Sequence, residues 1–141
     1  MQILPENILR CMHPEDLRLY AKGQLTAEQA VDKYCAREEK KLHKKFEDWC
    51  LLNREYLDYS HARMDKPTTN EVGLLDFHVW TAQHHCFVEF KSEHGRTSPA
   101  QEKFIQNQLR LGVPVLVSTS FSAATGFVRR QLHVSIVEIG T

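Results

Sequence analysis

Two stretches of alternating polar and apolar residues, 75–80 and 86–91, constrain the fold of this chain more than any other feature. Successive side chains of a β-strand point to opposite faces of the sheet. One face of the two predicted strands is apolar and consists of Leu75, Phe77, Val79, Cys86, Val88 and Phe90. The opposite face carries Asp76, Glu89 and Lys91, together with His78, Trp80 and Phe87. Because carboxylate oxygens suit hard divalent cations, this polar face predicts a metal site.

Length and composition indicate one compact domain. The chain has 141 residues, of which 42% are hydrophobic and 26% are charged, and this is enough for a single core. No apolar run approaches the roughly 20 residues that span a bilayer. The first residues lack the charged and apolar regions of a signal peptide. We therefore expect a soluble protein without a membrane partner, located in the cytoplasm.

Charge and cysteine content narrow the possible partners and compartments. The formal net charge is zero, so an anionic partner must be attracted by local basic patches. The four cysteines form no C-x-x-C pair, and Cys35, Cys50 and Cys86 fall within apolar patterns. The sequence therefore predicts buried free thiols in preference to disulfides.

The first half of the chain reads as helical. Thr26 and Gln29 fit a capping box, and a helical pattern continues from them towards Tyr56. Because this stretch is much longer than the mean helix of roughly 11–12 residues, we expect a break near Ala36. A shorter helix before it is predicted by Pro14 near a first turn and by Gly23 beyond a helix end.

The second half reads as alternating strands and helices. Residues 65–71 have no apolar period and predict a loop, and 93–97 predict a turn. Ser98, Pro99 and Gln101 form a strong helix start, and Gly112 ends that helix. Further strands are expected at 59–61, 113–117 and 134–139, with a helix over 122–132. Together these elements predict an α/β domain with a mixed central sheet.

The long helix adds a third carboxylate and a group of lysines. Glu39 lies on or beside the apolar stripe of Leu42, Phe46 and Trp49, where a carboxylate is desolvated unless a cation meets it. The remaining arc of the helix carries Lys40, Lys41, Lys44 and Lys45. These lysines either hold phosphates or form a solvated helix face with pairs to Glu47 and Asp48.

These residues occur in an order that resembles a known family. The quoted segments are Glu39-x-x-Leu42 running into Trp49, Gly73-Leu74-Leu75-Asp76, Phe87-Val88-Glu89-Phe90-Lys91, Ser98-Pro99-Ala100-Gln101 and Gly112-Val113-Pro114-Val115. Their order is similar to that of the VRR-NUC branch of the PD-(D/E)xK nucleases, over roughly residues 39–128. Two positions depart from the family pattern: Leu75 replaces a proline, and His43 replaces a common glutamine.

The resemblance implies a restriction-endonuclease-like core over 37–141, a mixed sheet flanked by helices, with 1–36 as a helical N-terminal extension of a single domain. It also implies that Asp76, Glu89 and the Phe90 backbone carbonyl bind Mg²⁺ or Mn²⁺, with Glu39 completing the site directly or through water. Lys91 would orient or activate the attacking water, and Gln101 would lie beside the site. Contacts to nucleic acid are expected from Lys40, Lys41, Lys44, Lys45, Arg96, Thr69 and Asn70.

The function implied by the resemblance is a structure-selective DNA endonuclease. Small stand-alone members of this branch, found in phages and bacteria, resemble Holliday junction resolvases and act as homodimers. Branched DNA is therefore the expected substrate, in a bacterial or phage-infected cell, and the N-terminal helices are a candidate dimer surface. The alternatives are a monomeric nickase or flap nuclease, and a DNA-binding module of the same fold without cleavage. A protein-interaction domain would explain none of the shared polar face.

Several other residues have two possible interpretations. His78 shares the strand face of Asp76 and either lines the cleft or is merely exposed. A zinc site from His84, His85, Cys86 and His94 lacks a known ligand spacing. Arg96, Arg129 and Arg130 are either phosphate contacts or ordinary surface arginines.

Overall fold

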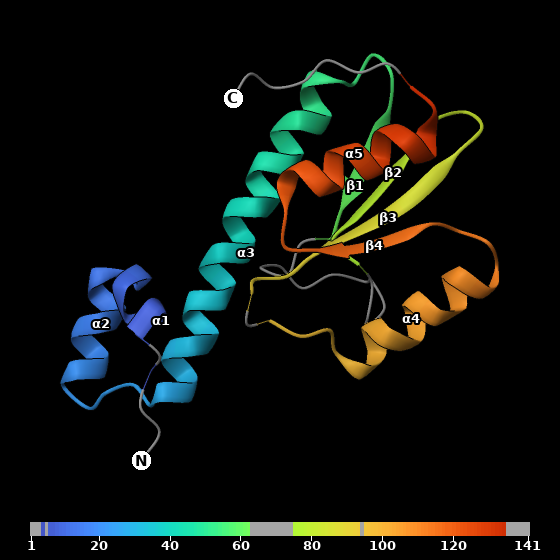
Figure 1. Cartoon of the computed structure of the whole chain (residues 1–141). Helices are drawn as coiled ribbons and strands as arrows, with labels where there is room; N and C mark the ends of the chain where they lie inside the picture. Colours follow the sequence, from blue (N-terminus) through green and yellow to red (C-terminus); the bar gives the residue numbers. More distant parts are fainter. Residues whose placement is uncertain (1–3, 5, 63–74, 94, 135–141) are drawn as a thin grey trace.

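The computed structural model describes residues 4, 6–62, 75–93 and 95–134 (Figure 1). Its elements are α1 Glu6–Cys11, α2 Pro14–Ala21, α3 Ala27–Leu52, β1 Asp58–His61, β2 Phe77–Trp80, β3 His85–Phe90, α4 Pro99–Arg110, β4 Val115–Ser118 and α5 Phe121–Leu132. The expected mixed α/β fold is confirmed: across the described residues, a four-stranded sheet is flanked by helices.

The sheet has the strand order β1-β2-β3-β4. The pairs β1/β2 and β2/β3 are antiparallel, whereas β3 and β4 are parallel. Phe77 lies opposite Val88, and Val79 lies opposite Cys86, and all four side chains are fully buried. The predicted apolar face is therefore confirmed, and its register fixes which polar residues share the opposite face.

Helices α3 and α5 cover the apolar face of the sheet, and α4 lies on the other side (Figure 1). Phe46 of α3 is at the centre of this core. Its ring centroid lies 4.7 Å from that of Phe77 and 5.3 Å from that of Phe90. On the opposite face, Phe104 of α4 meets Phe87 of β3 edge to face at 5.3 Å. The sheet therefore lies between two helical layers.

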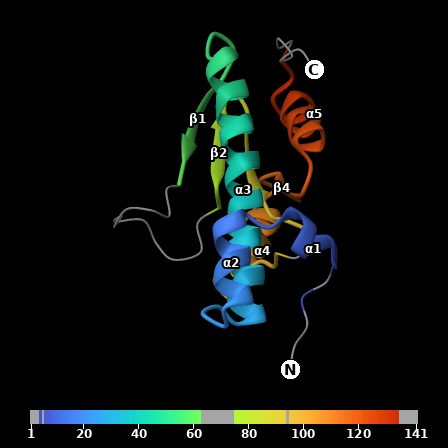
Figure 2. The same ribbon diagram turned by 90° about the vertical axis from the view of Figure 1, so that its left-hand side faces the viewer.

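The N-terminal helices α1 and α2 pack on the first half of α3, away from the sheet (Figures 1 and 2). They form a second apolar cluster from Leu4, Ile8, Met12 and Ala30. Asp16 of α2 is 3% exposed and forms ion pairs with Arg37 at 2.9 Å and Lys33 at 3.6 Å. These contacts join α2 to α3, and α1 was not predicted as a separate helix.

The expected break near Ala36 is wrong, because α3 is one helix of 26 residues. Each half of α3 packs against a different apolar cluster, around Ala30 and around Phe46. Tertiary packing of an amphipathic face supplies most of the stability of a helix in a protein. Packing against these two clusters stabilises both halves of α3, so the helix continues without a break between them.

The helix termini follow the sequence signals. Thr26 and Ser98 both form complete capping boxes, with Gln29 and Gln101 respectively. Gly112 has a φ of +81°, which suits its place directly after α4. The predicted loop at 65–71 and residues 135–139 of the last predicted strand lie outside the described residues.

The cysteines are free thiols, as expected. Cys50 and Cys86 are buried, whereas Cys35 is only half-buried and Cys11 is exposed. Burial raises the pKa of Cys86 to about 12. The buried thiols of Cys50 and Cys86 contribute to packing. Among the described helices, none is both long and apolar enough to cross a membrane.

We expect Phe46→Ala to lower the free energy of unfolding by about 3–5 kcal/mol, because it leaves a cavity between two aromatic rings. Urea denaturation followed by circular dichroism measures this loss. Leu51→Ala, on the same helix but 46% exposed, is the matched control and should change stability by less than about 0.5 kcal/mol. Equal effects of the two substitutions would contradict the central place of Phe46.

Candidate functional site

Asp76 and Glu89 meet at one end of the paired strands β2 and β3. Glu89 Oε2 accepts a hydrogen bond from the Asp76 backbone N–H at 2.8 Å. Asp76 Oδ2 accepts one from the Phe90 backbone N–H at 2.9 Å. The two side chains are only 7% and 1% exposed. Each carboxylate is therefore fixed by the backbone of the strand that carries the other.

The second oxygen of Glu89 contacts two further predicted site residues. Glu89 Oε1 lies 3.1 Å from Lys91 Nζ and accepts a hydrogen bond from Gln101 Nε2 at 2.8 Å. The Gln101 Oε1 atom also accepts the Ser98 backbone N–H that begins α4. Gln101 thus caps its helix and contacts the site, which are the two compatible roles that the sequence suggested.

Glu39 lies elsewhere in the same region. Its Oε1 accepts the Ser92 backbone N–H at 3.2 Å, just beyond β3. A Cβ atom on Gly95 would stand 2.6 Å from this oxygen, so a side chain at position 95 would displace the Glu39 carboxylate from its present place. Among the described residues, no three or more His, Cys, Asp or Glu side chains form a group that could hold a metal ion. The structure therefore groups Asp76 with Glu89 but does not add Glu39 to them.

The surroundings of Glu89 change the acidity of its carboxyl group. Burial, together with the negative charge of Asp76, raises the pKa of Glu89 to about 7. The backbone hydrogen bond from Asp76 and the charge of Lys91 act in the opposite direction but only in part. Glu89 therefore holds its proton over a range where an exposed glutamate is ionised.

His43 had no defined role from the sequence, and the residues behind it were not predicted. His43 Nε2 lies 2.8 Å from Asp76 Oδ2, and His43 Nδ1 lies 3.4 Å from His61 Nε2. His61 Nδ1 in turn lies 3.1 Å from Glu47 Oε2, and the Tyr59 hydroxyl donates to Glu47 Oε1 at 3.1 Å. The available signal was the four-residue spacing of Glu39, His43 and Glu47, which places them on one face of α3.

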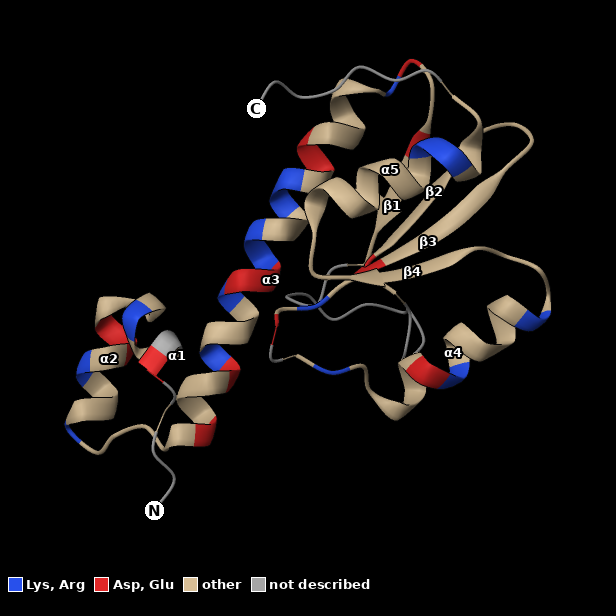
Figure 3. Ribbon diagram, in the orientation of Figure 1, with Lys and Arg blue, Asp and Glu red and all other residues tan. Residues whose placement is uncertain are grey.

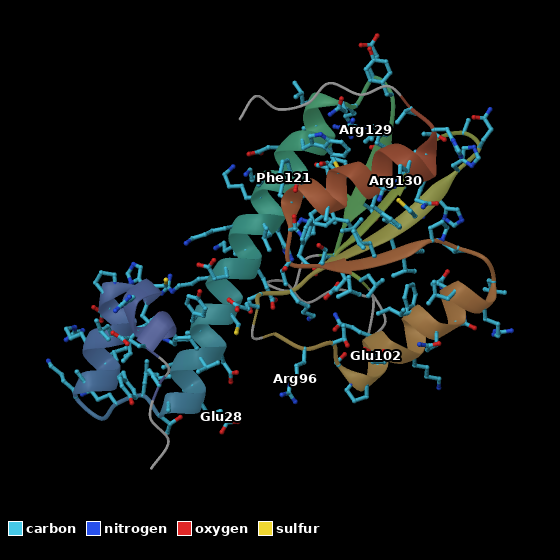
Figure 4. The ribbon with its side chains drawn as sticks, in the orientation of Figure 1. Glu28, Arg96, Glu102, Phe121, Arg129 and Arg130 are labelled. Atoms are coloured by element: carbon cyan, nitrogen blue, oxygen red, sulfur yellow. The ribbon has the colours of Figure 1, made fainter. Side chains whose placement is uncertain are left out.

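A cavity of about 690 Å³ opens beside Lys91, between the segment after β3 and the end of β4. Its lining includes Lys91, Ser92, Arg96, Thr97, Ser118 and Thr119. The buried Ser92 Oγ has no hydrogen-bond partner among the described residues. Figure 4 shows the Arg96 side chain extending away from the ribbon. The lining therefore combines hydroxyl side chains with charges of both signs, since Glu93 also belongs to it.

The four lysines predicted to contact phosphates are exposed along α3, where Figure 3 shows a basic band. Lys41 pairs with Glu38 at 3.1 Å, and Lys44 pairs weakly with Asp48 at 3.4 Å. Lys45 Nζ lies 4.6 Å from the ring centroid of Phe121. These contacts agree in part with a solvated helix face, and they leave the charges accessible.

The remaining candidates lie apart from the two carboxylates or outside the described residues. His78 Nε2 lies 3.0 Å from His85 Nδ1, and the His78 ring stacks on Phe87. Cys86 points into the core, so it cannot join His85 in a zinc site. Arg129 and Arg130 lie near the end of α5, across the sheet from α4 (Figure 4). Outside the described residues are Thr69, Asn70 and His94.

The raised pKa of Glu89 predicts a specific effect of pH on stability. Between pH 4.5 and 7 the folded protein keeps the Glu89 proton while the unfolded chain loses it, so wild-type stability falls as pH rises. In metal-free buffer with EDTA, Glu89→Gln should therefore gain on the order of 2–3 kcal/mol relative to wild type between pH 4.5 and 8. Urea denaturation across this range measures the difference. The exposed control Glu55→Gln should differ from wild type by the same free energy of unfolding at every pH. The same constant difference for Glu89→Gln would contradict a raised pKa of Glu89.

Comparison with known proteins identifies the family. The family model of the VRR-NUC domain matches residues 3–122 of the 141. This range begins before α1, so it includes the N-terminal helices that the sequence analysis placed outside the likeness. The curated proteins and the solved structures gave no match. The match covers most of the chain, and the mixed α/β fold agrees with it: the protein belongs to the VRR-NUC family of nucleases, whose fold is of the PD-(D/E)xK type.

Proposed function

We propose that this chain is a metal-dependent DNA endonuclease. Its proposed active site, formed by Asp76, Glu89 and Lys91, hydrolyses phosphodiester bonds. The observation that carries the proposal is the reciprocal pair of Asp76 and Glu89, with Lys91 Nζ 3.1 Å from Glu89 Oε1. Two buried carboxylates and a lysine at one end of the central strands have no evident role in stability, because the carboxylates repel each other. They are better explained as reaction chemistry.

The donor atoms of the pair fit a hard divalent cation. Carboxylate oxygens and a backbone carbonyl are typical ligands of Mg²⁺, and Mn²⁺ accepts the same set. In our proposal Asp76, Glu89 and the Phe90 carbonyl hold the cation, and Glu39 contributes directly or through a water molecule. When bound, the cation acidifies a coordinated water and offsets charge on the phosphate. The raised pKa of Glu89 comes from burial and from the charge of Asp76, and a bound cation would offset both effects.

Lys91 and Gln101 complete the proposed active site. The Lys91 side chain is 16% exposed and ends beside Glu89, where it can orient the attacking water and stabilise negative charge on the phosphate. Gln101 holds Glu89 Oε1 at 2.8 Å, and this bond keeps the carboxylate oriented. A positioned general base or electrostatic donor of this kind contributes about 10²–10⁴-fold to a rate.

The exposed lysines of α3 are the proposed contacts to the DNA backbone. The protein has no net charge, so attraction to DNA must come from a local patch such as Lys40, Lys41, Lys44 and Lys45. Arg96 beside the cavity is a further proposed phosphate contact. Thr69 and Asn70 lie outside the described residues. They are proposed to contact the DNA backbone where it enters the active site.

The proposed substrate is branched DNA, such as a Holliday junction, cut by a homodimer. A single site in each protomer, repeated by two-fold symmetry, would cut two strands. The helices α1 and α2 project from the sheet along α3 (Figure 2), and this position supports a dimer contact that leaves the active site open. A monomer would instead favour the alternative function of a nickase or flap nuclease.

The decisive experiment is a cleavage panel of linear, flap and four-way DNA with Mg²⁺ or Mn²⁺. We expect wild-type cleavage of the four-way substrate, and Asp76→Asn and Lys91→Met should each lower its rate by about 10²-fold or more. The matched controls Asp48→Asn and Lys103→Met remove exposed charges far from Asp76 along the chain and should retain activity.

The outcomes of this panel separate the alternatives. Binding without cleavage by the wild type, with either metal, would identify a DNA-binding module and overturn the enzymatic proposal. Cleavage of flap or nicked DNA alone, by a protein that light scattering shows to be monomeric, would favour the nickase. Cleavage that survives Asp76→Asn would place the active site elsewhere.

Replacing Lys40, Lys41, Lys44 and Lys45 by glutamine should weaken DNA binding uniformly across sequences. The logarithm of the affinity falls as the logarithm of the salt concentration rises. Each lost phosphate contact makes this negative slope shallower by about 0.9. Fluorescence anisotropy in EDTA, where no cleavage occurs, measures this slope. The matched control is Lys22→Gln with Lys103→Gln, two exposed lysines on other elements. Identical slopes for wild type and the α3 variant would mean that these lysines serve solubility only.

A further inference from the structure

We infer that His43 is a positioning residue for Asp76, and that it is supported by a second histidine, His61, and by Glu47. The inference rests on the proposed function, because it assumes that Asp76 binds a divalent cation. His43 comes from α3, Asp76 precedes β2 and His61 lies in β1. Three separate segments therefore bring these side chains to one place.

The two carboxylate oxygens of Asp76 differ in their hydrogen bonds. Oδ2 meets His43 Nε2 at 2.8 Å and accepts the Phe90 backbone N–H at 2.9 Å. A carboxylate only accepts, so the His43 Nε2 atom must carry the hydrogen. Among the described residues no hydrogen bond reaches Oδ1. The two donors on Oδ2 therefore fix the carboxylate and leave Oδ1 as its ligand atom.

The His43 ring is itself held on several sides. It meets the rings of Phe77 and His61 edge to face, at centroid distances of 5.7 Å and 5.2 Å. His61 stacks on Phe77 at 4.2 Å and points its Nδ1 at Glu47 Oε2, 3.1 Å away. The His43 and His61 side chains are each 18% exposed. Little space remains for the His43 ring to turn away from Asp76.

The positions of the hydrogens follow from the two carboxylates. His43 donates from Nε2 to Asp76, and His61 donates from Nδ1 to Glu47. The remaining nitrogens, His43 Nδ1 and His61 Nε2, lie 3.4 Å apart, so the contact between the two rings is weaker than their contacts to the carboxylates. Burial lowers the pKa of His61, in keeping with a neutral ring. His61 therefore supports His43 by packing, and Glu47 fixes the orientation of His61.

This arrangement makes distinct predictions for side chains of different shape. Glutamine at position 43 keeps an N–H donor for Asp76, whereas alanine does not. Phenylalanine at position 61 keeps the packing against His43 and Phe77, whereas alanine loses it. The conservative variants should therefore retain the function of the site.

The experiment measures Mn²⁺ affinity by isothermal titration calorimetry on the full chain, without any cleavage readout. His43→Ala should weaken Mn²⁺ binding by about 10-fold or more, the usual effect of losing a residue that orients a metal ligand. His43→Gln and His61→Phe should remain within about threefold of wild type, on the same scale. His78→Gln, a histidine substitution whose side chain contacts His85 and Phe87, is the matched control and should bind as wild type does.

Three results would overturn the inference in distinguishable ways. If wild type and His43→Ala bind Mn²⁺ equally, His43 does not position Asp76, and the proposed function is unaffected. If the wild type binds no Mn²⁺ at all, the proposed function fails and the inference fails with it. Equal weakening by His43→Gln and His43→Ala would assign His43 a purely structural role.

A second measurement uses the wild-type protein and therefore does not depend on the folding of a variant. The ¹⁵N chemical shifts of the imidazole nitrogens report which nitrogen of His43 carries hydrogen. In the metal-free protein we expect hydrogen on His43 Nε2 and on His61 Nδ1. Hydrogen on His43 Nδ1 with a bare Nε2 would rule out the hydrogen bond to Asp76 and overturn the inference.

Discussion

The reciprocal hydrogen bonds between Asp76 and Glu89 are the interaction on which the rest of the site depends. Each carboxylate accepts a backbone N–H from the opposite strand, so two acidic groups stay together inside the protein despite their repulsion. The pairing works only because β2 and β3 are antiparallel in the observed register. A shift of either strand by one residue would turn its own carboxylate towards the apolar core. The core face of the sheet therefore determines the geometry of the polar face.

Side chains from three further segments converge on this pair. Helix α4 reaches Glu89 Oε1 through Gln101, Lys91 reaches the same oxygen from the end of β3, and α3 reaches Asp76 Oδ2 through His43. Burial and the charge of Asp76 raise the pKa of Glu89, so ionising this carboxyl is less favourable here than in water. Such unfavourable arrangements are typical of functional sites, where local stability is exchanged for reactivity.

Sequence reasoning succeeded where the signal was local and failed where it was not. The alternation around Phe77 and the capping box at Ser98 are complete within a few residues, so the strands and α4 were predicted correctly. The continuity of α3 depends on packing with α1 and α2, and no property near Ala36 reveals that packing. The contact of Glu39 was also hidden, because its partner is a backbone N–H of Ser92. A backbone donor has no side-chain signature in a sequence.

The rotation of α3 about its own axis links the core to the site. Glu39, His43 and Glu47 lie four residues apart and contact Ser92, Asp76 and His61 respectively. All three would move together if the helix turned. Phe46 lies against Phe77 and Phe90 and sets this rotation from the apolar side, because close-packed interiors resist small shifts. The packing that stabilises the sheet thus also aligns the acidic pair, and neither can change without the other.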